Sequence, residues 1–391
     1  MIIAIDSRPL VQAQIQGAQQ RARNLLASLV RLGPEHEFHL LYPRPVRRSA
    51  PTFDPSLLAS LPANFHATQI STYQFPSSFH TASRVLNTLS RTINRIKASV
   101  YLSFTPDVPR IDCCPVVPTI HDLSFELDPV VRRTPEGKRL HKVTSHSIRY
   151  ARRIMAVSSQ TKYDIASVYN YPLDKIDVIY NGIDPAFTPA PPTAVPTLLP
   201  IHTDNHIAPP YILSVGADIP RRNYARVLAA MQAVWSTKDS TGPRTLWVLA
   251  GRDNWPETPI YAAAKKAGAL SRIRFVNAPT NPQLADLYRA ATITCCASSF
   301  EGFGLSVLES MACGTAAACS DMRSLREVAE TAAVYFPHDD SEFMGQAIAG
   351  LLDDAEYRRQ LKYRGIYRAS LFTWDTAAQL TLASLSAATE G

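Results

Sequence analysis

The 391-residue sequence has only six cysteines, and their spacing suits no cysteine-based site. They form neither a CxxC redox pair nor the paired spacing of a zinc ribbon, and most stand within apolar runs. We therefore expect reduced core residues in a cytoplasmic protein. No apolar run approaches the roughly 20 residues of a membrane-spanning helix. The amino-terminal residues have no signal-peptide pattern, so we expect any membrane contact to be peripheral.

The sequence also lacks internal repeats and low-complexity tails. With 46% apolar residues, a chain of this length is too long for one ordinary core, so we expect two domains. Apolar runs alternate with helical stretches in both halves, which is typical of parallel βαβ units. The candidate strands cover residues 1–6, 38–42, 100–104, 116–121, 154–158 and 178–180, and then 211–216, 246–251, 273–276, 293–297, 315–319 and 334–336.

A stretch rich in proline separates the two halves, with seven prolines between residues 189 and 210. Proline sustains neither a helix interior nor a central strand, so this stretch is predicted to be an extended linker. The expected fold is α/β, with two Rossmann-like, doubly wound parallel-sheet domains facing a cleft. We place the domains at residues 1–190 and 211–370, with the linker at 191–210.

The net charge of +7 is concentrated in the first half. Residues 1–195 carry 22 Lys and Arg against 14 Asp and Glu, whereas the remainder carries 18 against 19. The excess lies in residues 83–97, which have helical apolar spacing, and in residues 132–153. Such a basic helix can lie on an anionic membrane or attract a phosphate-bearing acceptor, or it can be a solvated helix over the core. The candidate patch consists of Arg84, Arg91, Arg95 and Lys97.

No aromatic stacking pattern or known reader motif accompanies this charge, so nucleic acid is not an expected partner.

Two glutamates, Glu301 and Glu309, flank a glycine-rich turn in the second half. The first follows a strand-like run, and the second is expected two turns into the next helix. Ligands bind outside the carboxyl ends of parallel strands, where helix N-termini attract phosphate. Because carboxylates suit sugar hydroxyls and helix amides suit a diphosphate, this segment predicts a nucleotide-sugar site.

The second domain opens with a strand, a turn and a helix that is expected to begin near Asn223. The turn carries Gly216, Arg221 and Arg222. Two arginines beside a helix N-terminus supply forked donors for a diphosphate leaving group. An exposed basic turn without a ligand is the alternative.

Two residues of the first domain follow predicted strands. His121 ends an apolar strand whose carboxyl end is expected to face the cleft, which favours contact with a sugar over a role in the core. Gly17 is expected in a loop before a helix that begins near Arg21, where backbone can approach phosphate.

These segments together resemble the retaining glycosyltransferases of family 4, which are two-domain GT-B enzymes, and especially their bacterial mannosyltransferase-like branch. The last helix of that family crosses back to the first domain, and residues 371–391 are expected to form it. The matching stretches are residues 5–10, 119–125, 178–184, 215–223, 301–309 and 372–378.

The resemblance implies transfer of a hexose from a nucleotide diphosphate to an acceptor hydroxyl, with the anomeric configuration kept and without a metal or other cofactor. Glu301 would contact the donor sugar, Glu309 the ribose, and Arg221 and Arg222 the diphosphate, while His121 would face the sugar from the first domain. Further donor contacts are expected at Gly17, Gly216, Asn277, Gly302, Phe303, Gly304 and Leu305.

The resemblance to this branch implies GDP-mannose as the first candidate donor, and UDP- and dTDP-sugars are the alternatives. The expected acceptor is a lipid-linked oligosaccharide of a bacterial surface polysaccharide, extended by a cytoplasmic enzyme that can be peripheral on the inner face of the cell membrane.

The chain departs from the family in two places. Arg222 stands where the family usually has lysine, which keeps the charge and changes its geometry. The branch commonly reads Gly-Ile-Gly-Arg-Tyr where this chain has Gly17-Ala18-Gln19-Gln20-Arg21. The second glycine is thus replaced by Gln19, so a shifted acceptor or reduced activity is expected.

Two other readings remain open. A GT-B epimerase or an inverting transferase is less favoured, because inverting relatives need a general base and lack the spaced glutamate pair. A catalytically silent subunit that binds nucleotide-sugar is favoured by the altered first loop.

Overall fold

A computed structural model of the chain describes residues 1–7, 10, 16–44, 62–73, 83–108, 110–190, 200–238 and 244–390. The chain forms two compact units, one of residues 1–182 with 372–391 and the other of residues 183–371. The first boundary thus falls at 182, whereas the sequence analysis placed it at 190. Residues 191–199 of the expected linker lie outside the described residues.

Unit 1 contains a seven-stranded parallel sheet in the order β3-β2-β1-β4-β5-β6-β7. Chain order runs outward from β1 on one side and from β4 on the other, so the topological switch point lies between these two strands. The strands are β1 (Ile2–Asp6), β2 (Glu37–Arg44), β3 (Phe65–Tyr73), β4 (Val100–Ser103), β5 (Val116–Ile120), β6 (Ile154–Ala156) and β7 (Ile176–Val178).

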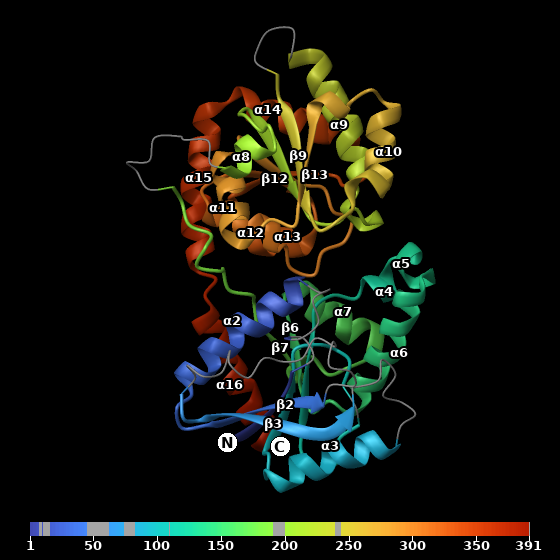
Figure 1. The fold of residues 1–391 in the computed structure, drawn as a ribbon, viewed down its shortest axis with the longest axis vertical. Coiled ribbons are helices and arrows are strands. Elements are labelled where there is room, and N and C mark those ends of the chain that lie inside the picture. The colour runs from blue at the N-terminus through green and yellow to red at the C-terminus, as the bar shows by residue number, and fades with distance from the viewer. Residues whose placement is uncertain are drawn as a thin grey trace. The chain divides into compact units, whose positions relative to one another are not determined.

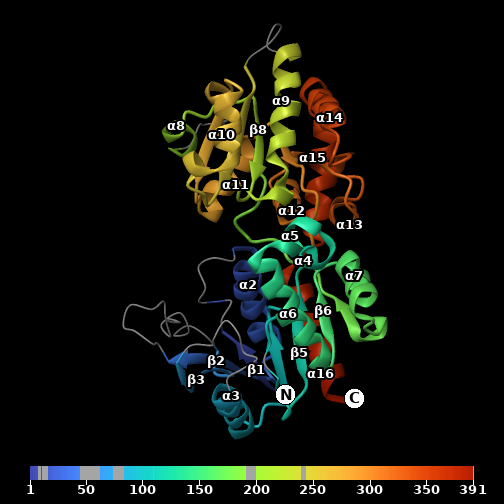
Figure 2. The ribbon, with the colours of Figure 1, turned by 90° about the vertical axis from the view of Figure 1, so that its right-hand side faces the viewer.

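Helices cover both faces of this sheet (Figures 1 and 2). Helices α2 (Gln16–Leu32) and α16 (Trp374–Glu390) pack together in one core cluster with β1 and β2. Helix α3 (Ser83–Arg95) packs against the opposite face. Unit 1 also contains α4 (Ser124–Leu127), α5 (Pro129–Arg133), α6 (Pro135–Tyr150) and α7 (Ser159–Tyr169).

Unit 2 contains a six-stranded parallel sheet in the order β10-β9-β8-β11-β12-β13. Its switch point lies between β8 and β11. Two doubly wound α/β domains are therefore confirmed. The strands are β8 (Tyr211–Val215), β9 (Leu246–Gly251), β10 (Ile273–Asn277), β11 (Ile293–Cys296), β12 (Ala316–Ser320) and β13 (Ala333–Phe336).

The helices of unit 2 lie on both sides of its sheet (Figure 2). One core cluster joins α9, α10, α14 and α15 to the apolar strands. The helices are α8 (Pro200–Asp204), α9 (Tyr224–Lys238), α10 (Pro259–Lys266), α11 (Asn281–Ala290), α12 (Leu305–Ala312), α13 (Arg323–Ala329), α14 (Ser341–Asp353) and α15 (Ala355–Ser370).

Three details differ from the sequence analysis. Helix α8 lies within the expected extended linker, because Pro200 occupies the first helical position, where the missing amide costs nothing. Strand β3 was not predicted, and β7 begins two residues before the expected 178–180.

The cysteines form no disulfide, and four of them, Cys295, Cys296, Cys313 and Cys319, are buried. Within the described residues, no helix combines the length and apolar character that crossing a membrane requires.

Candidate active site

The candidate site lies at the switch point of unit 2, where β8 and β11 are neighbours in the sheet. The loop after β8 carries Arg221 and Arg222, and the loop after β11 carries Glu301. A backbone hydrogen bond ties the loops together, because the Ser299 amide donates to the Arg221 carbonyl over 2.8 Å. Residues 80 positions apart are thereby brought to one edge of the sheet.

Glu301 is the centre of a charged group and is only 9% exposed. Its Oε1 accepts hydrogen bonds from Arg222 Nη1 at 2.7 Å and from Ser298 Oγ at 2.8 Å. Its Oε2 accepts from Arg221 Nη1 at 3.3 Å. The Ser324 hydroxyl donates to its backbone carbonyl at 2.6 Å, which ties the loop to α13. The carboxylate is therefore held in a fixed position.

These contacts keep the group ionised. Burial alone would raise the pKa of Glu301, but attraction to Arg222 and Arg221 and the hydrogen bond from Ser298 hold it below its usual value. Burial lowers the pKa of Arg222, yet attraction to Glu301 raises it by more. Two guanidiniums against one carboxylate leave a local excess of one positive charge.

Gly216 makes room for Arg222. It has a φ of +129°, and a Cβ at this position would stand 2.7 Å from Arg222 Nε. That Nε is buried and has no hydrogen-bond partner among the described residues. A glycine is thus required both by the backbone conformation and by the guanidinium beside it.

The N-terminus of α12 lies directly after the glycine turn. Gly304 has a φ of +107°, and the amides of Val307 and Leu308 both donate to its carbonyl. The preceding amides, of Leu305 and Ser306, therefore come before the first bonds of the helix, where amides can meet an anion. Gly302 and Phe303, which complete the turn, are buried.

Glu309 lies on α12, little more than one turn from its start rather than the expected two turns. It is half-buried, and its Oε2 accepts a hydrogen bond from the Tyr288 hydroxyl at 2.9 Å. Burial raises its pKa to about 7, against the lowering effect of Tyr288 and Arg222. The carboxyl can therefore change its charge near neutral pH.

His121 lies at the carboxyl end of β5 in unit 1. Burial and repulsion from the Arg21 charge lower its pKa to about 4, so the ring is neutral at pH 7. Nε2 lies 2.8 Å from the Phe104 carbonyl and must donate the proton, because a carbonyl only accepts. Nδ1 therefore keeps a lone pair and can accept a hydrogen bond.

Arg21 is fully buried, which lowers its pKa to about 9. Its Nη1 donates to the Ile179 carbonyl at 3.2 Å and to the Asn181 side-chain oxygen. After burial, its charge is the second cause of the lowered pKa of His121. In the sequence analysis, Arg21 served only to mark the start of a helix.

The other expected positions are scattered over the two units. Gly17 lies in the first turn of α2, which begins at Gln16 and not near Arg21, so the expected loop there is helical. Asn277 is exposed and ends β10. Arg84 lies in α3. Arg91, Arg95 and Lys97 are exposed, whereas Leu89 and Ile93 of the same segment are buried in the core. The apolar face of this helix is therefore covered by the protein.

The second basic segment contributes to a cavity of about 530 Å³ in unit 1. Arg132, Arg149 and His141 line it together with Glu126. Glu126 accepts from His141 Nδ1 at 2.6 Å and from the Tyr169 hydroxyl at 2.5 Å. Both arginines are exposed.

Sequence reasoning also missed Ser298, Ser324 and Tyr288. Ser298 could have been inferred, because a hydroxyl two residues after the end of β11 is within reach of the loop. Tyr288 and Ser324 come from helices on other segments, and no local pattern marks them.

Comparisons with known proteins identify the family and the fold. The family model described as "Glycosyltransferase Family 4" matches residues 15–187, and the one described as "Glycosyl transferases group 1" matches residues 203–368. The O-antigen chain mannosyltransferase B of Escherichia coli is 27% identical over 267 residues, which are 68% of this chain and 68% of that protein.

Two solved structures share the fold over nearly the whole chain. Sucrose-phosphate synthase of Thermosynechococcus elongatus has a TM-score of 0.75 at 18% identity and covers 99% of this chain and 98% of its own. Anabaena HepE in complex with UDP-glucose has a TM-score of 0.70 at 15% identity and covers 99% of this chain and 100% of its own. The two sheets and these structural likenesses show the GT-B fold, and the two family models identify the chain as a glycosyltransferase. Within that class, the chain belongs to glycosyltransferase family 4.

Proposed function

We propose that this protein is a retaining glycosyltransferase that moves mannose from GDP-mannose to a hydroxyl of a lipid-linked oligosaccharide in bacterial surface polysaccharide biosynthesis. The observation that carries the proposal is the group of Arg221, Arg222 and Glu301 beside the N-terminus of α12. Its excess positive charge and the helix amides suit a diphosphate that gains charge as it leaves. The likeness to the E. coli mannosyltransferase favours mannose.

In the proposed reaction, the bond from the anomeric carbon to the diphosphate oxygen breaks, and a bond to the acceptor oxygen forms on the same face of the sugar. The acceptor proton passes to the leaving diphosphate. Arg221 and Arg222 stabilise the charge on that group, Glu301 accepts hydrogen bonds from sugar hydroxyls, and Glu309 binds the ribose. In this mechanism, positioning of the substrates and electrostatic stabilisation of the leaving group accelerate the transfer, without a covalent nucleophile or a metal.

The geometry of unit 1 supports a role for His121 towards the donor sugar. Its neutral ring offers a lone pair at Nδ1, which suits a hydroxyl donor. A protonated ring would instead repel the cationic charge of a developing oxocarbenium ion. Asn277, at the carboxyl end of β10, is our candidate for contact with the base.

The acceptor side rests on the two basic segments. Arg132 and Arg149 offer the cavity of unit 1 two guanidiniums that suit the phosphate of a lipid-linked acceptor. The exposed Arg91, Arg95 and Lys97 suit an anionic membrane surface by charge alone, because the apolar face of α3 is covered.

Two observations favour other candidates. The Gln19 side chain donates to the Leu10 carbonyl at 3.4 Å and so fills a position where the branch has a bare glycine, which favours a silent binding subunit. The fold shared with HepE, solved with UDP-glucose, favours a UDP-sugar as donor.

The decisive experiment is a thermal-shift and hydrolysis screen of the purified protein against GDP-, UDP-, dTDP- and ADP-sugars, with EDTA and with added Mg²⁺. Selective stabilisation by GDP-mannose, slow release of mannose in EDTA, and an α-linked product by NMR are expected. Stabilisation without release of the sugar, even with polyprenol-linked acceptors, would instead support a catalytically silent subunit that binds nucleotide-sugar.

A further inference from the structure

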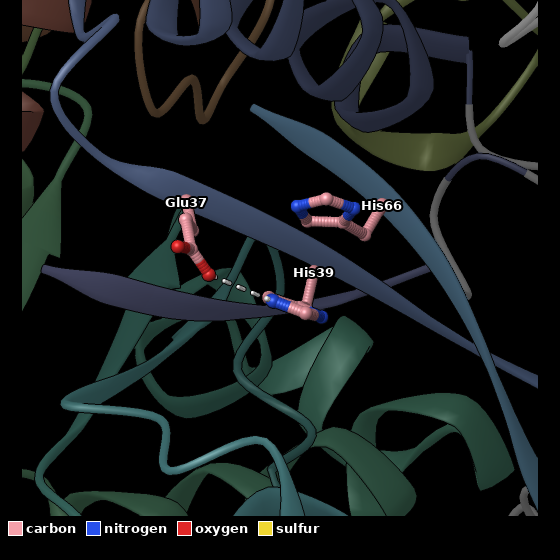
Figure 3. A group of neighbouring side chains, drawn as sticks. All are labelled: Glu37, His39 and His66. Atoms are coloured by element: carbon pink, nitrogen blue, oxygen red, sulfur yellow. Dashed lines mark ion pairs between the residues drawn. The ribbon is translucent and has the colours of Figure 1, made fainter. Parts of the chain in front are cut away.

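Three potential metal ligands meet on one face of the sheet of unit 1. Glu37 and His39 are two residues apart on β2 and therefore point to the same side. His39 is directly opposite His66 of β3 in the strand register. One ligand atom from each of the three residues lies within 4.8 Å of the other two (Figure 3). Hydrogen-bonded strands thus hold all three side chains.

The orientation of His39 suits a metal ligand. Its Nδ1 lies 3.1 Å from the Thr68 hydroxyl, and its Nε2 lies 3.6 Å from Glu37 Oε2. With the proton on Nδ1, donated to Thr68, the lone pair of Nε2 faces the carboxylate. A cation between these two electron-rich atoms would satisfy both.

We propose that Glu37, His39 and His66 bind one Zn²⁺ ion, which joins the edge strand β3 to β2. Two imidazoles and one carboxylate are a ligand set that zinc accepts in proteins, with water at the fourth position. Bonds of about 2.0–2.1 Å in a tetrahedron place the ligand atoms about 3.4 Å apart. The 3.6 Å between His39 and Glu37 is close to that value, so most of the adjustment falls on the exposed His66 ring.

The place of this site in the fold assigns it a structural role. Glu37 is the first residue of β2 and His66 the second of β3, so the ligands lie at the amino ends of these strands. Ligands of doubly wound sheets bind at the opposite, carboxyl ends. Among the described residues, strand β3 is at the edge of the sheet and has a pairing neighbour, β2, on one side only. A metal that joins it to β2 stabilises the folded chain by mass action.

The test is a titration of ZnCl₂ into the metal-free full-length protein without any nucleotide-sugar, followed by calorimetry. A second titration with Co²⁺ is read by its visible absorption. We expect one equivalent of Zn²⁺, a tetrahedral Co²⁺ band and a rise in Tm. Loss of a residue that only hydrogen-bonds a metal ligand weakens metal binding by about 10- to 100-fold. The variants His66→Ala and Glu37→Gln remove a ligand itself, so they should weaken Zn²⁺ binding by more than this. Thr68→Val removes the hydroxyl that hydrogen-bonds the His39 ligand, so it should weaken Zn²⁺ binding by about 10- to 100-fold.

The control is His206→Asn in unit 2, because His206 is exposed and has a positive φ that asparagine tolerates. It should bind Zn²⁺ as the unaltered protein does. Equal weakening in the control, unchanged binding in His66→Ala, or several weak equivalents without a tetrahedral Co²⁺ band would each overturn the proposal. A variant that unfolds leaves the Co²⁺ spectrum of the unaltered protein as the deciding measurement. Because no donor is present, the outcome is independent of the Glu301 site.

Discussion

The guanidinium of Arg222 occupies the space that a side chain at Gly216 would need. A Cβ there would stand 2.7 Å from Nε and 3.0 Å from Cζ of Arg222. The same guanidinium holds the carboxylate of Glu301 at 2.7 Å. A single methyl group added at Gly216 would therefore disturb the contact between Arg222 and Glu301 without altering any charge.

The first prediction is that Gly216→Ala lowers turnover by about 10²-fold, the scale of losing one positioned electrostatic group. The new Cβ must displace Arg222, and the φ of +129° is strained for alanine. Initial rates of sugar release from the donor that the screen identifies measure the effect.

The control for this prediction is Gly268→Ala. Gly268 also has a positive φ, of +66°, but a Cβ there meets nothing within 4 Å. It should lose only about 1 kcal/mol of stability for backbone strain and keep its turnover. An equal loss of turnover in both variants would show that strain, and not displacement of Arg222, is responsible.

The second prediction concerns the residue at which this chain departs from its family. Arg222→Lys keeps the charge near Glu301 and should retain turnover to within about tenfold, whereas Arg222→Ala and Glu301→Ala should each lower it by about 10²-fold or more. The two alanine variants should also lose about 3 kcal/mol of stability, because each removes one member of the largely buried ion pair between Arg222 and Glu301. Kinetics and urea denaturation measure the two effects.

Arg326→Ala is the matched control. It breaks an ion pair with Asp321 in which both side chains are about half exposed, 52% and 46%. Such a pair is worth about 1 kcal/mol at most. A folded Glu301→Ala protein with normal turnover would show that the site is elsewhere.

The third prediction is that Arg91→Gln, Arg95→Gln and Lys97→Gln together weaken binding to anionic vesicles by about 10²-fold, at about 1 kcal/mol for each basic residue. The reason is charge alone, because Leu89 and Ile93 are buried beneath them. Sedimentation with vesicles at two salt concentrations measures it. Release of sugar from the soluble donor should not change.

A triple variant of unit 2, Lys265→Gln, Lys266→Gln and Lys362→Gln, removes the same charge from other exposed positions. If both triple variants bind vesicles equally, net charge and not this helix determines the attraction. If neither differs from the unaltered protein, α3 is a solvated helix without a membrane role.

Much of the fold could be predicted from the sequence, because buried parallel strands are uninterrupted apolar runs. β9, for example, begins and ends where predicted, at Leu246 and Gly251. Strand β3 was missed because it is an edge strand whose polar and exposed residues, His66 and Gln69 among them, give no apolar run. Helix α8 was missed because its first residue is proline, and the prolines of this stretch had been taken as evidence for an extended linker.

The site was predictable where it depends on local segments. Glu301, Arg221 and Arg222 each follow a strand that the sequence reveals, and parallel order brings those strand ends together. That the two arginines bind Glu301 itself did not follow, because the conformation of the two loops decides it. Tyr288 and Arg21 were missed for a similar reason, since each acts on a residue that is distant in sequence.

The last prediction uses the pKa of Glu309, which burial raises to about 7. If the carboxylate accepts hydrogen bonds from the ribose, only its ionised form binds well. The affinity for nucleotide should therefore rise about tenfold between about pH 6 and pH 8. The stability of the folded chain should change in the opposite direction. The carboxyl of Glu309 binds its proton more tightly in the folded than in the unfolded chain, so its contribution to the free energy of unfolding is lost as the pH rises from the usual pKa of 4.5 to about 7.

Two variants separate this effect from ionisation of the nucleotide itself. Glu309→Gln removes the titrating group, and its remaining pH dependence of binding is that of the nucleotide alone. Tyr288→Phe removes the hydroxyl that donates to the carboxylate at 2.9 Å, which should raise the pKa of Glu309 further and move the rise in affinity to higher pH. Calorimetric titration of the nucleoside diphosphate measures all three proteins. The same pH dependence in the unaltered protein and in Glu309→Gln would show that Glu309 does not bind the ribose.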